Sequence, residues 1–169
     1  CISYLSYYGE VVTPRELREP MGLYIYGCDR CQNVCPRNTA ALTSEKMENF
    51  KLHKMAENFM PEKILLMDEE YFKNNIWPYM FYMSYRDVWR WRMNAARVMG
   101  NLGDRKYIPV LAEGYEKFDD ERVRIMIAWA LGKIGGDESW KILKRLLKNA
   151  SMPIKEEIEF ALSIIAKNE

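Results

Sequence analysis

The sequence of 169 residues has no long hydrophobic run and almost no histidine. No stretch of about 18 consecutive apolar residues occurs, so no membrane-spanning helix is expected. No basic segment followed by an apolar one opens the chain, so no secretory signal is predicted and a cytoplasmic location is expected. His53 is the only histidine. It lies in a polar stretch without periodicity, where a surface position is expected, and no nucleophile–base pair can be built around it.

A strong excess of charge of either sign is also missing. The chain has 25 Lys and Arg against 24 Asp and Glu, which leaves a net charge of +1. Such a balance does not exclude nucleic-acid binding, because a basic face can form locally. Since 49% of the residues are hydrophobic and many are aromatic, the chain can bury a sizeable core.

Residues 1–40 contain all four cysteines and little periodicity, which predicts a turn-rich first domain. One short helix is expected within it. Thr13 suits the N-cap, Pro14 the first helical position, and Glu16 completes a capping box. Pro20 then ends the helix within about two turns.

Residues 41–84 predict a connector of irregular helical segments. One segment is expected over 44–50. A second begins at Pro61, because proline is favoured in the first turn of a helix. A third begins at Asp68, which is a good N-cap.

From residue 85 onward the helical periodicity is clear. A helix is predicted over 86–102 and a second over about 106–118. The apolar face of the first contains Val88, Trp91, Ala95, Val98, Met99 and Leu102. The opposite face contains Arg86, Arg90, Asn94, Arg97 and Asn101.

This helical unit then repeats. Residues 95–104 are echoed by residues 127–137, with Gly100 and Gly132 separated by 32 positions. Further helices are expected over about 138–149 and 153–167. A helix pair recurring at this period predicts a short HEAT-type α-solenoid over residues 85–169. Small residues allow close helix approach in such a stack: Ala96, Gly100, Ala128 and Gly132.

The cysteines form the most informative motif. Cys28, Cys31 and Cys35 read C-x2-C-x3-C-P, the spacing of ferredoxin-type iron–sulfur sites, and Cys1 stands apart. In two-cluster ferredoxins the last cysteine of such a run ligates the other cluster. The fold class expected is mostly α, with a cysteine-rich ferredoxin-like half-domain followed by the solenoid. The few repeats are expected to pack against this half-domain or against sequence upstream of it.

Two other chemistries suit four cysteines. Structural zinc accepts four thiolates, but its sites usually come as two C-x2-C pairs, and only one pair occurs here. Disulfides are disfavoured by the absence of secretory features. Iron–sulfur ligation is preferred over zinc, and zinc over disulfides.

The motifs at residues 1–5 (CISYL), 22–38 and 92–101, together with the repeats, resemble the epoxyqueuosine reductase family. Its members combine a cobalamin-binding domain, a double [4Fe-4S] domain and HEAT-like repeats, and they reduce epoxyqueuosine to queuosine in the tRNA anticodon. The resemblance implies one cluster on Cys1, Cys28 and Cys31, and a second on Cys35. The remaining ligands lie upstream.

The resemblance also implies that the chain is a C-terminal fragment. The usual C-x2-C-x2-C-x3-C-P motif and the cobalamin domain with its catalytic acid are absent, so the fragment alone is not expected to catalyse the reaction. Ser3 and Asp29 lie beside ligand cysteines and are candidates to approach the cobalamin. The alternative for both is a hydrogen bond within a turn or cap.

Two basic sets are candidates to contact the phosphates of the tRNA anticodon stem-loop. The alternative is that each is a solvated outer face. The sets are Arg86, Arg90 and Arg97, and Lys141, Lys144, Arg145 and Lys148.

Two features depart from the family pattern. Arg37 stands where the family usually has an aromatic residue, and residues 79–91 are unusually aromatic. Two alternatives therefore remain: an electron-transfer iron–sulfur paralogue with another substrate, and a zinc-stabilised HEAT-repeat module that binds a partner.

Overall fold

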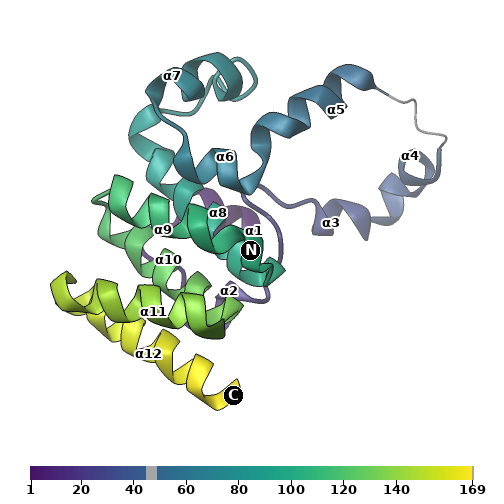
Figure 1. Cartoon of the computed structure of the whole chain (residues 1–169). Helices are drawn as coiled ribbons and strands as arrows, with labels where there is room; N and C mark the ends of the chain where they lie inside the picture. The colour runs from purple at the N-terminus through teal and green to yellow at the C-terminus, as the bar shows by residue number, and fades with distance from the viewer. Residues whose placement is uncertain (45–48, 169) are drawn as a thin grey trace.

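The computed structural model describes residues 1–44 and 49–168, and the secondary structure of these residues is helical throughout (Figure 1). The prediction of a mostly α fold is confirmed. The described residues contain no strand, so a ferredoxin-like strand pairing is not seen in the cysteine-rich part. Helices α3, α4 and α5 form an arm that projects from a compact stack of the later helices (Figure 1).

The first 40 residues form short helices separated by turns. One prediction here was wrong: Thr13 does not cap a helix. Pro14 takes the N-cap position of α2 without a side-chain capping bond, while the buried Thr13 accepts a hydrogen bond at its main-chain oxygen from Arg18 Nε, at 2.8 Å. The helices are α1 (Ile2–Tyr7), α2 (Arg15–Arg18), α3 (Arg30–Asn33) and α4 (Thr39–Thr43).

The helices of the connector start at the residues that local sequence signals predicted. Pro61 opens α6, and the Asp68 side chain caps α7 by accepting from the Tyr71 amide at 2.8 Å, so both predicted starts are confirmed. Of the helix predicted over 44–50, residues 45–48 lie outside the described part of the chain. The helices are α5 (Phe50–Ala56), α6 (Pro61–Leu66) and α7 (Glu69–Tyr71).

Five longer helices build the second half of the chain, close to the predicted bounds. Gly103, with φ of 66°, takes the left-handed conformation that ends the first of them. The Asp120 side chain caps α10 by accepting from the Arg122 amide. The helices are α8 (Val88–Leu102), α9 (Ile108–Lys117), α10 (Glu121–Ile134), α11 (Gly136–Leu146) and α12 (Met152–Asn168).

Helix α10 lies at the centre of the core, packed against α8 on one side and α12 on the other. Glycines permit both approaches. A Cβ at Gly100 would stand 2.9 Å from the Cα of Ala130, and one at Gly132 would stand 2.5 Å from the Cβ of Ala161. The close helix approach predicted from the small residues is therefore confirmed.

The polar face of α8 is not solvated. Four of its side chains each donate hydrogen bonds to main-chain carbonyls within residues 6–24, at donor–acceptor distances of 2.5–3.0 Å. We call this set the carbonyl-binding face. It consists of Arg90, Asn94, Arg97 and Asn101. Because α8 belongs to the helical stack, this face holds the cysteine-rich segment against the stack. The repeats therefore pack against that segment, which is one of the two arrangements expected from the sequence.

A buried ion pair fastens the same segment to the last helix. Arg18 Nη1 lies 2.8 Å from Glu157 Oε1, and both side chains are 4% exposed. Arg15 adds a second contact to the other carboxylate oxygen, at 3.1 Å. Residues 13–18 therefore bridge α8 and α12, at opposite sides of the central helix.

Candidate functional site

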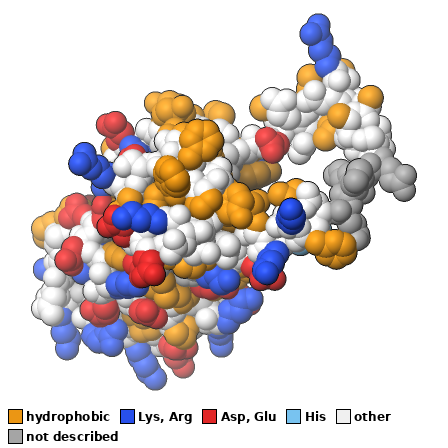
Figure 2. Space-filling model, turned by 90° about the horizontal axis from the view of Figure 1, so that it is seen from above, with side chains coloured by type: hydrophobic (Ala, Val, Ile, Leu, Met, Phe, Trp, Pro, Cys, Tyr) orange, Lys and Arg blue, Asp and Glu red, His pale blue; other side chains and the backbone are white. Residues whose placement is uncertain are grey.

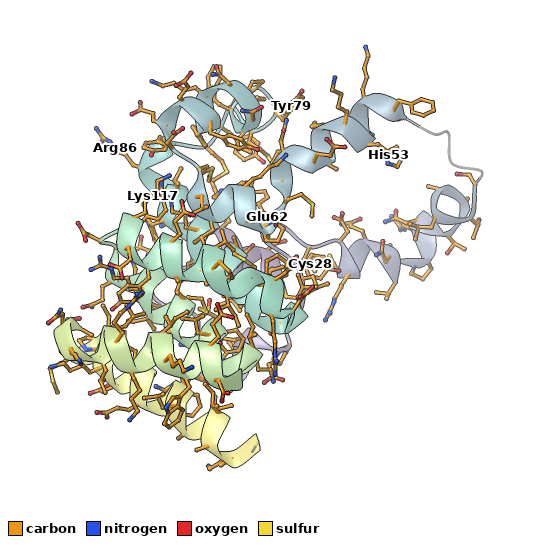
Figure 3. The ribbon with its side chains drawn as sticks, in the orientation of Figure 1. Cys28, His53, Glu62, Tyr79, Arg86 and Lys117 are labelled. Carbon is orange, nitrogen blue, oxygen red and sulfur yellow. The ribbon has the colours of Figure 1, made fainter. Side chains whose placement is uncertain are left out.

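Three of the four cysteines surround one cavity at the base of the arm. Cys1, Cys28 and Cys31 line a space of about 490 Å³, although Cys1 is far from the others in sequence. Cys35 does not line it. Figure 3 shows Cys28 where the arm leaves the body. Cys1, Cys28 and Cys31 therefore share one cavity, and the assignment of the four cysteines to two clusters stays a prediction.

The turn that presents Cys28 is positioned by glycines and by α8. Gly22 and Gly27 have φ values of 61° and 68°, in the left-handed region that glycine adopts without strain. The guanidinium of Arg97 donates to the carbonyls of Gly22 and Tyr24, at 2.6 and 2.5 Å. The main chain before Cys28 is therefore held against the helical stack.

The donor set suits a cluster of several metal ions. All four cysteines are free thiols. Within residues 1–44 and 49–168, no three His, Cys, Asp or Glu side chains stand close enough to hold one metal ion. Iron–sulfur clusters are held by cysteine thiolates, so the chemistry of these donors fits such a cluster. The cavity also has an apolar wall, formed by Ile2, Leu5, Leu17, Pro20 and Met21.

The two residues predicted to approach a cofactor follow ligand candidates in sequence, Ser3 after Cys1 and Asp29 after Cys28. Asp29 is exposed and takes the N-cap position of α3, but its side chain makes no capping hydrogen bond. Ser3 accepts a hydrogen bond from Ser6 Oγ at its main-chain oxygen, at 3.2 Å. The cap alternative is thus not seen for the Asp29 side chain, and the cofactor role of both residues stays a prediction.

The basic set on α11 is exposed. Lys144 lies 5.0 Å from the centre of the Trp140 ring, and Arg145 forms a solvent-exposed ion pair with Glu116 at 3.5 Å. Lys141 and Lys148 are also exposed. Acidic and basic side chains are interspersed over the body in the view from above (Figure 2). The α11 set keeps the accessibility that a phosphate contact requires.

The other basic set, with Arg86 just before α8 and Arg90 and Arg97 within it, is divided. Arg86 is exposed on the side of the body opposite the arm (Figure 3). Arg90 is partly buried, paired with Asp87 and bonded to the Gly9 carbonyl. Arg97 is completely buried, and the loss of hydration lowers its pKa to about 10. The prediction that Arg97 contacts phosphate was therefore wrong, because its guanidinium is enclosed and bound to carbonyls.

Sequence reasoning missed the carbonyl-binding face, although one signal for it was present. Two of its four members, Asn94 and Asn101, are amides, which cannot neutralise phosphate but suit carbonyl acceptors. The aromatic stretch 79–91 contains both buried and exposed side chains. Trp91 is buried and stacked on Tyr26, with ring centres 5.0 Å apart, whereas Phe81 is 70% exposed.

Comparison with known proteins accounts for both halves of the chain. Residues 86–163 match the family of HEAT repeats, which confirms the predicted solenoid. Epoxyqueuosine reductase from Pseudomonas aeruginosa is 32% identical over 80% of this chain and 37% of its own length. The structure of epoxyqueuosine reductase from Bacillus subtilis superposes with a TM-score of 0.78 at 26% identity, covering 98% of this chain and 44% of the other.

The chain is homologous to the C-terminal region of epoxyqueuosine reductase. It spans less than half the length of these relatives. A further epoxyqueuosine reductase, crystallised with an epoxyqueuosine-modified tRNA-Tyr stem loop, superposes with a TM-score of 0.75 at 26% identity over 98% of this chain and 44% of that one. The resemblance drawn from the cysteine motif and the repeats is confirmed. Among the described residues, no helix is long and apolar enough to cross a membrane.

Proposed function

We propose that the chain is the C-terminal part of a cytoplasmic, iron–sulfur and cobalamin-dependent reductase that converts epoxyqueuosine to queuosine in tRNA. The observation that carries this proposal is the placement of Cys1, Cys28 and Cys31 around one cavity, with Cys35 outside it. The homology to epoxyqueuosine reductase supports the choice of reaction. The chain by itself is not expected to catalyse it.

In this proposal Cys1, Cys28 and Cys31 hold one [4Fe-4S] cluster, and Cys35 is one ligand of a second. The remaining cysteine ligands and the cobalamin site belong to an upstream part of the same protein. Bound clusters supply electrons one at a time, and the cobalamin cofactor carries the difficult reduction. The residues of this chain would bind the cluster through thiolates, pack apolar side chains beside it, and hold the Cys28 turn through Arg97.

The α11 set is the part of this chain proposed to contact tRNA. Lys141, Lys144, Arg145 and Lys148 are exposed along one helix and its continuation. Cationic side chains of this kind neutralise phosphates without reading sequence. The reductase crystallised with a tRNA stem loop supports the choice of partner.

Iron content tests the cluster assignment. In the full-length protein, Cys28→Ala removes one ligand of one cluster, so about half of the iron should be lost. Thr43→Ala, an exposed change on α4, should leave the iron content unchanged and serves as control. An unchanged iron content in Cys28→Ala would contradict the assignment of Cys28 as a cluster ligand. Zinc found in place of iron and sulfide favours the zinc-stabilised module.

Salt-dependent binding tests the tRNA interaction. Reversing two charges, Lys144→Glu with Arg145→Glu, should weaken tRNA binding and lower the salt slope by about one unit for each phosphate that is no longer neutralised. The matched control makes the same charge change on exposed α5 residues, Lys51→Glu with Lys54→Glu. If affinity and salt slope both stay unchanged in the folded α11 variant, that face is a solvated surface. Cluster loading without any tRNA binding favours an electron-transfer paralogue.

A further inference from the structure

We propose that Arg30 raises the reduction potential of the cluster held by Cys1, Cys28 and Cys31. This inference rests on the proposed function, since it requires a cluster in the cavity. It adds a role for a residue that is not itself a ligand. Arg30 lies between two ligand cysteines in sequence and is the first residue of α3.

The Arg30 side chain belongs to the cavity. It lines the same space as the three cysteines. Its guanidinium carbon lies 5.6 Å from the centre of the Tyr24 ring, and one of its terminal nitrogens lies 3.8 Å from the position that a Cβ on Gly22 would occupy. The side chain therefore folds back over the turn of residues 22–24, beside the cysteines.

The charge of Arg30 is not neutralised by a neighbour. In the described part of the chain, the ion pairs within 4.0 Å involve other cations, and none includes Arg30. The adjacent carboxylate, Asp29, does not line the cavity. Arg97 binds the Gly22 and Tyr24 carbonyls of the same turn, so a second cation contacts that turn.

An uncompensated cation at this position favours the reduced cluster. Reduction adds one negative charge to a cluster that already carries four thiolate ligands. A nearby positive charge stabilises the more negative state, and net charge is one of the factors that set the reduction potential of these clusters. Because Arg30 is exposed, dissolved salt should screen part of the effect.

The test measures the midpoint potential of the cluster. The 169-residue chain is reconstituted without oxygen using ferrous iron, sulfide and dithiothreitol, which supplies a thiol to the remaining iron. Arg30→Gln should shift the midpoint to a more negative value. We expect the ratio of reduced to oxidised cluster at a fixed potential to fall about tenfold, which corresponds to about 59 mV for one electron. The shift should shrink as the salt concentration rises.

Two variants separate charge from structure. Arg30→Lys keeps the positive charge but loses the planar group over Tyr24, and it should keep most of the potential. Arg37→Gln removes the same charge from a residue that does not line the cavity, and it should shift the potential less. An unchanged midpoint in a cluster-loaded Arg30→Gln overturns the inference, as does loss of iron in both Arg30 variants. If the unaltered full-length protein takes up no iron, the proposed function fails, which is a different result from an unchanged midpoint.

Discussion

Arg97 takes a positive charge into the interior without an acidic partner. Its side chain is fully buried, its terminal nitrogens bind two carbonyls, and its Nε has no partner among the described residues. Burial lowers its pKa to about 10, so it stays charged at neutral pH. Because the folded-state pKa lies below the unfolded-state value, the charge costs stability at neutral pH. That cost fades only as the pH rises above about 10. The hydrogen bonds to the Cys28 turn offset it.

Replacing Arg97 by Met should lower the free energy of unfolding by about 2–3 kcal/mol. The apolar side chain leaves the Gly22 and Tyr24 carbonyls without their donor, and charged hydrogen bonds of this kind contribute about 1.5–3 kcal/mol. Urea denaturation measures the change. Arg86→Met alters an exposed residue of the same type near the same helix, so it should stay within about 0.5 kcal/mol of the unaltered protein. Equal stability of the two variants contradicts the role given to Arg97.

Helix α8 is the element on which the two halves of the chain meet. Its apolar side packs against α10, and its carbonyl-binding face holds residues 6–24. Ordinary surface helices bury one face and solvate the other. Here both faces are covered, so a change on the polar face reaches the cysteine turn. Helix α12 is tied to the same segment by Arg18 and Glu157.

Glu157→Gln should destabilise the attachment of α12 by about 3 kcal/mol. The change leaves Arg18 charged and buried without its carboxylate, and breaking a buried pair at one partner costs about 3–5 kcal/mol. The amide oxygen of the new Gln side chain still accepts one hydrogen bond, so the expected loss is at the lower end of that range. Thermal or urea unfolding gives the measurement. Glu156→Gln, one residue away and exposed, should have almost no effect. A similar loss in both variants would point to helix charge and not to the buried pair.

At the scale of the whole molecule, a short solenoid is completed by the segment that carries the cysteines. Residues 1–24 cover α8 and reach α12, while the arm of α3, α4 and α5 projects away from the core (Figure 1). The contacts that fasten this segment are made by residues 6–24 and not by the thiols. Folding of the helical stack should therefore not require the metal.

Metal-free protein should keep most of its helix. Metal binding and folding are coupled where no site forms beforehand, and this applies to the arm and the Cys28 turn but not to α8–α12, whose apolar faces are buried against one another. Circular dichroism before and after chelation of reconstituted protein should show only a small loss. Hydrogen exchange should locate that loss in the turn and arm. Loss of nearly all helix would show that the repeats depend on the cluster.

Local sequence patterns determined the helical architecture. The 3.6-residue periodicity of 86–102, the echo of 95–104 in 127–137, and the signals at Pro61 and Asp68 each predicted an element that the structure contains. Such patterns succeed because helix hydrogen bonds and caps join residues only a few positions apart. The cysteine motif is local in the same way, and the ligand roles drawn from it stay a prediction.

Only the tertiary structure decided what each polar face meets. The sequence of α8 shows a polar face, but whether it meets water, phosphate or carbonyls depends on a segment far away in the chain, as the separations of 73 to 88 residues between Asn94, Arg97 and their acceptors show. The Arg18–Glu157 pair spans 139 residues, and Cys1 joins Cys28 only through folding. Burial and hydrogen bonding between distant segments leave no period in the sequence, so the sequence determined the helices, while packing determined which groups are available for function.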